Sequence, residues 1–182
     1  SISTGLKNNK FGVSEEIAFD LYKKMSKEPC LKISGIDCHI GSQMTSGMPI
    51  IEATDKIISL YKKLLAEGIK VDHIDMGGGL GVTYDNETPP TPSEYCAPIL
   101  ERLKDLDVSI YIEPGRAMVA NACILLAKVQ YQKDNGDKHF IITDTGMNDM
   151  IRPALYGSWM TIINTTVHPD GETVKSDVVG PI

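Results

Sequence analysis

The sequence lacks the features of a membrane protein and of a general nucleic-acid binder. No apolar stretch is long enough to span a bilayer, and no segment has the pattern of a signal peptide. The formal net charge is −6 and the basic residues form no cluster, which argues against a partner that presents many phosphates. These absences leave a globular protein whose partner is neither a membrane nor a nucleic acid.

Paired cysteines are also missing. Cys30, Cys38, Cys96 and Cys123 are scattered along the chain without a C-x-x-C pair. That spacing supports neither a disulfide framework nor a structural zinc site. We therefore expect reduced thiols in a cytoplasmic protein.

Helical patterns are what the chain does contain. The predicted helices run from Ser14 to about Lys27, from Ile50 to Glu67 and from Thr91 to about Lys104. Ser14 suits an N-cap, and Gly68 suits the left-handed turn that ends a helix. Thr91 and Glu94 have the spacing of a capping box, and Pro98 is expected to kink or restart its helix.

Strand patterns alternate with these helices at residues 31–38, 71–76 and 108–112. This alternation predicts right-handed crossovers and a parallel sheet. After residue 120 the pattern changes to residues 124–131, 140–143, 159–168 and 173–179, with a turn at Asn135-Gly136. We therefore predict an α/β domain over 1–120 and a mostly β domain over 121–182.

Three polar motifs directly follow the three predicted parallel strands. They are His39-Ile40-Gly41-Ser42-Gln43, Gly77-Gly78-Gly79 and Glu113-Pro114-Gly115-Arg116. Glycine loops and a hydroxyl suit a phosphate, an imidazole stacks on an aromatic ring, and a carboxylate keeps a ring nitrogen protonated. Each motif also has a structural interpretation: a tight glycine turn, a hydrogen-bonded histidine, or an ion pair in a loop. Their shared place at strand ends favours one site for a phosphorylated cofactor.

These motifs resemble the cofactor-binding strand ends of the fold-type III pyridoxal-phosphate decarboxylases. The resemblance extends through Ile36–Gln43, Asp75–Gly79 and Glu113–Arg116. The segment from Asp144 to Gly157 is similar to the diaminopimelate branch of that family, as are Ser3–Lys7 and Asn9–Gly12. Thr145 departs from the alanine that is more usual there, and little effect is expected.

The resemblance implies part of a (β/α)8 TIM-type barrel followed by the start of a mostly β domain. It implies pyridoxal 5′-phosphate as cofactor, held by His39, Ser42, Gly77, Gly78, Gly79, Glu113, Pro114, Gly115 and Arg116. Within that set, His39 would stack on the pyridine ring and Glu113 would lie against its nitrogen. Arg116, Arg152 and Tyr156 would grip the substrate, meso-2,6-diaminopimelate, which is converted to L-lysine and CO2 in a homodimer with shared active sites.

The resemblance also implies parts that the 182 residues do not contain. The Schiff-base lysine of the family is expected upstream of residue 1, and a proton-donor cysteine motif is expected after Val178–Ile182. Only three of eight barrel strands are recognisable, too few to close a barrel. We therefore expect a segment of a longer polypeptide that is inactive by itself.

Three alternatives stay open from the sequence. One is a sister decarboxylase of ornithine, arginine or carboxynorspermidine. Another is a non-catalytic relative that serves as a binding partner. The third is a metal-dependent barrel hydrolase that uses His39, His73, Asp75 and Glu113, although His73 and Asp75 precede their strand end rather than follow it.

Overall fold

The computed structural model describes residues 10–166, 171 and 173–181, which form two compact units. The first unit contains the described residues up to Thr83 together with Glu87–Ala122, and the second contains Tyr84–Asn86 and the described residues from Cys123 onward. The Ser3–Lys7 part of the resemblance and Asn9 of the Asn9–Gly12 part lie outside the described residues. The division of the sequence into domains at residue 120 stays a prediction.

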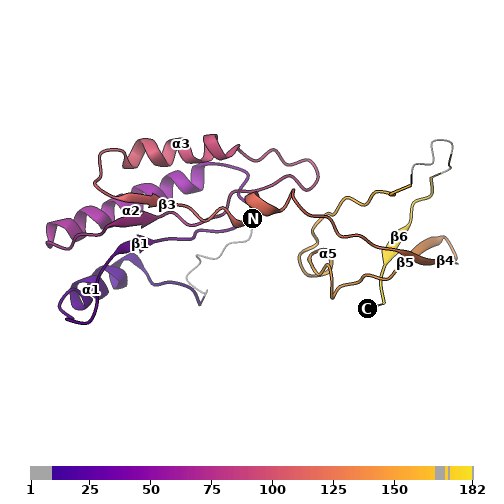
Figure 1. Cartoon of the computed structure of the whole chain (residues 1–182), viewed down its shortest axis with the longest axis horizontal. Coiled ribbons are helices and arrows are strands. Elements are labelled where there is room, and N and C mark those ends of the chain that lie inside the picture. Colours follow the sequence, from indigo (N-terminus) through magenta and orange to yellow (C-terminus); the bar gives the residue numbers. More distant parts are fainter. Residues whose placement is uncertain (1–9, 167–170, 172, 182) are drawn as a thin grey trace. The chain divides into compact units, whose positions relative to one another are not determined.

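The first unit is built on a parallel three-stranded sheet. Its strands are β1 (Gly35–Asp37), β2 (His73–Asp75) and β3 (Ser109–Tyr111), in the order β1-β2-β3 (Figure 1). The predicted parallel pairing is confirmed. The strands are shorter than predicted because flanking apolar residues such as Val71 and Val108 pack into the core without extending the strand ladder.

Three helices alternate with these strands, as predicted. They are α1 (Glu15–Met25), α2 (Met48–Ala66) and α3 (Pro92–Leu103). The Ser14 hydroxyl accepts a hydrogen bond from the Ile17 N–H, which caps α1, and Gly68 follows α2 with a φ of +77°. Among the described residues, no helix combines the length and apolar character that crossing a membrane requires.

The capping box of α3 is also confirmed, but Pro98 does not restart the helix. The Thr91 side chain accepts from the Glu94 N–H, and the Glu94 carboxylate accepts from the Thr91 N–H. Proline removes only one donor from the ladder. Tyr95 and Ile99, which are buried on either side of Pro98, hold the helix against the core.

The two faces of the sheet differ in chemistry. Ile36 and Ile74 lie side by side in the register and are only 2% and 0% exposed, within a core to which α2 and α3 contribute. Fully burying one such side chain contributes about 1.5–3 kcal/mol. Because side chains alternate along a strand, the opposite face carries Asp37, Asp75 and Tyr111. One face therefore holds the unit together and the other is polar.

The second unit contains a small mixed sheet in the order β4-β5-β6. Strand β4 (Val129–Asn135) pairs antiparallel with β5 (Lys138–Thr143) through a turn at Gly136, and β6 (Asp177–Val179) pairs parallel with β5. The predicted hairpin at Asn135-Gly136 is confirmed. Two short helices, α4 (Gly115–Val119) in the first unit and α5 (Arg152–Tyr156) in the second, were not predicted.

Other strand predictions in the second unit are wrong in part. The strand expected over 124–131 begins only at Val129, and the run expected over 173–179 forms a strand only at its end. No strand forms over residues 159–166, while 167 and 168 lie outside the described residues. Ile124, Ile162 and Ile163 are 89%, 68% and 80% exposed. A β-branched run forms a strand only where another strand pairs with it, and none among the described residues does so here.

The capping box makes the first turn of α3 a test of local stability. Thr91→Ala removes the acceptor for the Glu94 N–H and is expected to cost about 1 kcal/mol. Hydrogen–deuterium exchange in the full-length protein should accelerate about fivefold at the start of α3. Ser93→Ala, an exposed change in the same turn, is the control. Equal exchange in the two variants would contradict the role of the cap.

Candidate functional site

The loops that follow β1, β2 and β3 meet at one edge of the sheet. The Cys38 N–H donates to Asp75 O at 3.1 Å, and the Glu113 N–H donates to Gly77 O at 2.8 Å. The Met44 N–H donates to Gly79 O at 2.7 Å. Backbone hydrogen bonds therefore join the glycine loop to Glu113 and to Met44, and Cys38 to Asp75, so the residues that flank the His39–Gln43 motif are tied to the other two loops. The polar side chains of the three motifs thus lie within one region.

Gly77, Gly78 and Gly79 are required by the neighbouring loops. A Cβ atom on Gly77 would lie 2.3 Å from Cys38 O, and one on Gly78 would lie 2.2 Å from Glu113 O. Gly77 and Gly79 also have φ values of +67° and +106°, which residues with a Cβ adopt only with strain. Close backbone packing thus explains the three glycines without a ligand, and their binding of a phosphate stays a prediction.

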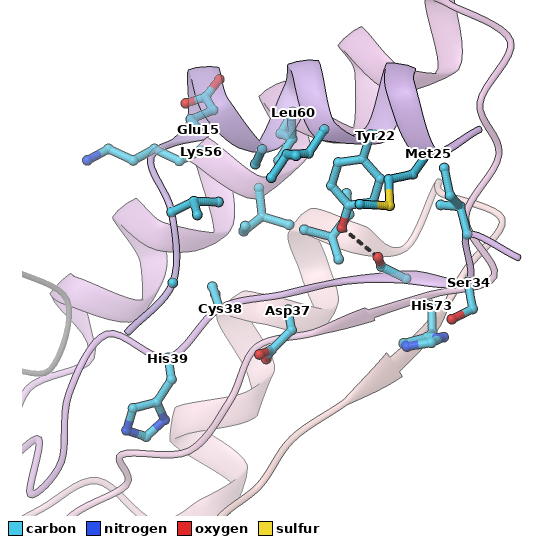
Figure 2. A pocket seen from close by; sticks show the side chains of 18 of the residues that line it. Glu15, Tyr22, Met25, Ser34, Asp37, Cys38, His39, Lys56, Leu60 and His73 are labelled. Carbon is cyan, nitrogen blue, oxygen red and sulfur yellow. Dashed lines mark hydrogen bonds between the residues drawn. The ribbon is translucent and has the colours of Figure 1, made fainter. Parts of the chain in front are cut away.

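His39 presents an exposed imidazole ring that is held at one nitrogen. The Gly78 N–H donates to His39 Nδ1 at 3.3 Å, so the neutral ring carries its proton on Nε2. Figure 2 shows His39 and Asp37 on the opposite side of β1 from Tyr22 and Leu60. A ring that is exposed and yet oriented is suited to stacking against a planar ligand.

Three carboxylates gather at the same edge of the sheet. Oxygen atoms of Asp37, Asp75 and Glu113 lie within 4.8 Å of one another, and Asp75 Oδ1 accepts from the Gly77 N–H at 2.8 Å. The group includes Asp37 and neither of the histidines that the hydrolase alternative requires. His73 instead stacks on Tyr111 with ring centroids 4.8 Å apart. Exposed carboxylates are common without a cation, so the cluster by itself assigns no metal site.

Arg116 lies in α4 and reaches back to the loop after β1. Its Nη2 donates to Ser42 Oγ at 2.9 Å, and its Nη1 donates to Gln43 Oε1 at 3.3 Å. Pro114 is the N-cap of α4, and Gly115, its first residue, has open space where a side chain would project. Together these residues place a hydroxyl, a guanidinium and an uncrowded backbone near one another.

The remaining predicted residues, Arg152 and Tyr156, belong to the second unit. The Arg152 guanidinium lies 5.3 Å from the ring centroid of Tyr156 and 5.4 Å from that of Tyr84, within the range of cation–π attraction. Its Nη2 donates to Ser158 Oγ at 3.2 Å. Its buried Nε has no acceptor among the described residues. The prediction that Arg152 and Tyr156 grip a substrate stays untested by these contacts.

Three residues at the site were given no role by sequence reasoning. Asp37 lies two residues before His39 and so shares its face of the strand, a signal that period-two alternation offers. Gln43 lies inside a motif that was recognised only for other residues. Tyr95 is buried in α3 and its hydroxyl donates to Gly78 O at 3.0 Å, which no sequence pattern reveals.

Burial changes the acidity of two groups under the site. It raises the pKa of the Cys38 thiol to about 11, with the charges of Asp37 and Asp75 adding to the effect. It also raises the pKa of Tyr95 to about 12. At neutral pH both groups are protonated, so Tyr95 remains a hydrogen-bond donor to the glycine loop and Cys38 is a poor nucleophile.

A groove of about 1090 Å³ runs along β1 beneath α1 (Figure 2). Its lining is mostly apolar, and the Tyr22 hydroxyl crosses it to donate to Gly35 O at 2.7 Å. Asp37 and His39 contribute to one part of its lining. The groove therefore adjoins the candidate site without containing most of its polar groups.

Comparison with known proteins gives a family and close relatives. Residues 1–120 match the family described as pyridoxal-dependent decarboxylase, pyridoxal binding domain. The chain is 55% identical over its whole length to a diaminopimelate decarboxylase of Haemophilus influenzae and 48% identical to one of Vibrio cholerae. It covers 44% and 43% of those relatives, so it spans less than half of their length.

A solved structure is similarly close. The diaminopimelate decarboxylase of Helicobacter pylori complexed with L-lysine is 42% identical, with a TM-score of 0.92. The match covers 100% of this chain and 45% of that one. Solved relatives of this kind confirm the predicted fold, an α/β part of a TIM-type barrel.

The crossing of Gly78 and Glu113 can be tested by adding one methyl group. Gly78→Ala would place its Cβ 2.2 Å from Glu113 O and is expected to cost about 1–3 kcal/mol in stability through overpacking. Gly47→Ala is the control because its Cβ would meet nothing within 4 Å. Thermal denaturation of the full-length variants should show the larger loss for Gly78→Ala, and equal losses would contradict the close crossing.

The raised pKa of Cys38 predicts slow alkylation. At pH 8 a thiol with a pKa near 11 is roughly one-thousandth thiolate, about a hundredfold less than one at its ordinary value of 9. Iodoacetamide labelling of the full-length protein should modify exposed Cys30 well before Cys38. Labelling of Cys38 should rise about tenfold per pH unit up to pH 11. Rapid labelling of native Cys38 at pH 8 would refute the shift, and denaturation should abolish the difference between the two sites.

Proposed function

Since the chain belongs to the pyridoxal-dependent decarboxylases, we propose that the full-length protein decarboxylates meso-2,6-diaminopimelate to L-lysine and CO2 with pyridoxal 5′-phosphate. The observation that carries the proposal is the meeting of His39, Glu113 and the Ser42–Arg116 pair at the carboxyl edge of a parallel sheet. Matches over the whole of this chain to diaminopimelate decarboxylases at 41–55% identity support the substrate.

The donor set of the first unit fits this cofactor. His39 offers an oriented, exposed ring for stacking, and Glu113 offers a carboxylate for the pyridine nitrogen. Ser42 and Arg116 offer a hydroxyl and a guanidinium, both suited to a phosphate. The backbone of the glycine loop and of Pro114-Gly115 would complete the phosphate site.

The bound cofactor supplies an electron sink for the pair of electrons left when the carboxylate departs as CO2. The protein's part is orientation and electrostatics. The Glu113 carboxylate would favour the protonated form of the ring nitrogen, which is the better electron acceptor. His39 would stack against the ring and restrain it. The residues that bind the substrate would orient the bond to be broken.

Substrate choice would depend on Arg116, Arg152 and Tyr156. The substrate carries a second amino-acid group away from the reacting carbon, and a planar guanidinium pairs with its carboxylate through two hydrogen bonds. The Arg152 guanidinium lies over the rings of both Tyr84 and Tyr156, and these contacts restrain it and support such a role. A site that pairs the distal carboxylate discriminates against amino acids without a second carboxylate, because its arginine would then be left unpaired.

The assembly and cellular location belong to the same proposal. We infer a cytoplasmic homodimer with shared active sites, supported by the family resemblance and by the scattered free cysteines. The lysine that carries the cofactor and the cysteine that acts as proton donor would come from parts of the full-length protein outside the 182 residues.

A lysine or ornithine decarboxylase is the nearest rival. A solved lysine/ornithine decarboxylase of Vibrio vulnificus complexed with cadaverine has a TM-score of 0.83 but only 28% identity. The higher identity to diaminopimelate decarboxylases and the segment from Asp144 to Gly157 favour diaminopimelate.

The function is tested with the full-length protein and a substrate panel. Added pyridoxal 5′-phosphate should produce a yellow absorbance band that changes when meso-diaminopimelate is added, as L-lysine and CO2 appear. Ornithine, arginine and lysine should be decarboxylated at least about a hundredfold more slowly, because the distal carboxylate is missing. A preference for any of these three amino acids would favour the rival function. If added pyridoxal 5′-phosphate gave no absorbance band, both the proposed function and the rival would be refuted.

A further inference from the structure

The backbone at Gln43 is strained. Its φ of +58° is the only positive value at a non-glycine residue in the part of the chain that the structure describes. For a residue with a Cβ this left-handed conformation costs energy, and it persists where surrounding interactions hold it in place. A glycine would adopt this conformation without strain, so the contacts of the Gln43 side chain must compensate for its cost.

The Gln43 side chain continues a backbone bridge between two loops. Met44 pairs with Leu80, and the Gly81 N–H donates to Met44 O at 3.0 Å. Beyond this bridge, Gln43 Oε1 accepts from the Val82 N–H at 3.1 Å and Gln43 Nε2 donates to Val82 O. The amide is thus fixed at both ends against a buried residue.

The same amide oxygen also orients Arg116. Gln43 Oε1 accepts from Arg116 Nη1 at 3.3 Å while Ser42 Oγ accepts from Nη2 at 2.9 Å. An amide oxygen has two lone pairs and can accept from Val82 and Arg116 together. Because the two contacts engage different terminal nitrogens, they fix both the position and the plane of the guanidinium.

We propose that Gln43 is a positioning residue that holds the guanidinium of Arg116 in register for an anionic group of the ligand. The shared chemistry is a phosphate or a carboxylate, either of which a guanidinium pairs through two hydrogen bonds. The role rests on the proposed function for the identity of that ligand. The Gln43 side chain connects three segments of the chain, because Gln43, Val82 and Arg116 follow β1, β2 and β3.

If the role of Gln43 were purely structural, only its hydrogen bonds to Val82 would matter. Loss of the amide leaves the buried backbone groups of Val82 without their partner, which would lower stability without any specific change in ligand binding. The experiment must therefore separate a general loss of stability from a change in the orientation of Arg116.

Two substitutions at position 43 serve this purpose in the full-length protein. Gln43→Met keeps the length of the side chain but removes the acceptor and the donor of the amide. Gln43→Gly suits the φ of +58° and so folds even if the methionine variant does not. Ile50→Val, a conservative change in the core of the same unit, is the stability control.

Two binding measurements distinguish the anionic groups. Titration of the cofactor-free protein with pyridoxal 5′-phosphate, followed by fluorescence, reports on the phosphate. The KM for meso-diaminopimelate at saturating cofactor reports on the carboxylate. We expect one of the two to weaken about tenfold in both Gln43 variants, the effect of one lost charge-assisted hydrogen bond, and neither to change more than about twofold in Ile50→Val.

Coupling to Arg116 completes the test. In an Arg116→Met background, Gln43→Met should weaken the affected one of these two measurements by no more than about twofold, because the guanidinium that Gln43 positions is gone. Compared with the wild type, crystal structures of the Gln43 variants should show the Arg116 guanidinium displaced from Ser42. Additive effects on affinity, or an Arg116 that stays in place in the variants, would overturn the proposal. If the wild type binds neither ligand, the proposed function fails, and the crystal structures alone then decide whether Gln43 holds Arg116.

Discussion

The parallel, in-register pairing of β1, β2 and β3 is the constraint on which the first unit depends. It aligns Ile36 with Ile74, which places apolar side chains on the face that joins the helices, and it aligns Asp37 with Asp75 on the other. Because the three strands run in the same direction, the loops that follow them must emerge at a common edge. The direction of the strands therefore determines where the candidate site lies, whatever side chains the loops carry.

At that edge the loops hold one another through their backbones. The glycine loop is confined between the carbonyl groups of Cys38 and Glu113, and the Tyr95 hydroxyl fixes it from α3. These contacts restrain the backbone at that edge, so His39 in its loop and Arg116 in α4 project from segments that are already placed. Such restraint would keep small the reorganisation that binding a ligand requires.

The sequence was sufficient for what periodicity and caps determine, namely three helices, three parallel strands, the capping box at Thr91 and the turn at Gly136. It failed where pairing with another strand decides the structure. The exposed run around Ile162 has the composition of a strand, but no strand among the described residues pairs with it. The motif residues were identifiable from their place after strands. The roles of Gln43 and Tyr95 were not, because both act through backbone groups of loops far away in the sequence.

The polar face of the sheet has a consequence for solvent. Asp37, Asp75 and Tyr111 lie on it, and an apolar layer could not cover them without desolvating two carboxylates at high cost. In a TIM-type barrel this face is turned toward the barrel interior, so these carboxylates need polar partners or ordered water there. Water held there would raise the local dielectric around Glu113, whose carboxylate lies with those of Asp37 and Asp75. A ligand that displaces this water would therefore strengthen the electrostatic interaction of Glu113 with a neighbouring ring.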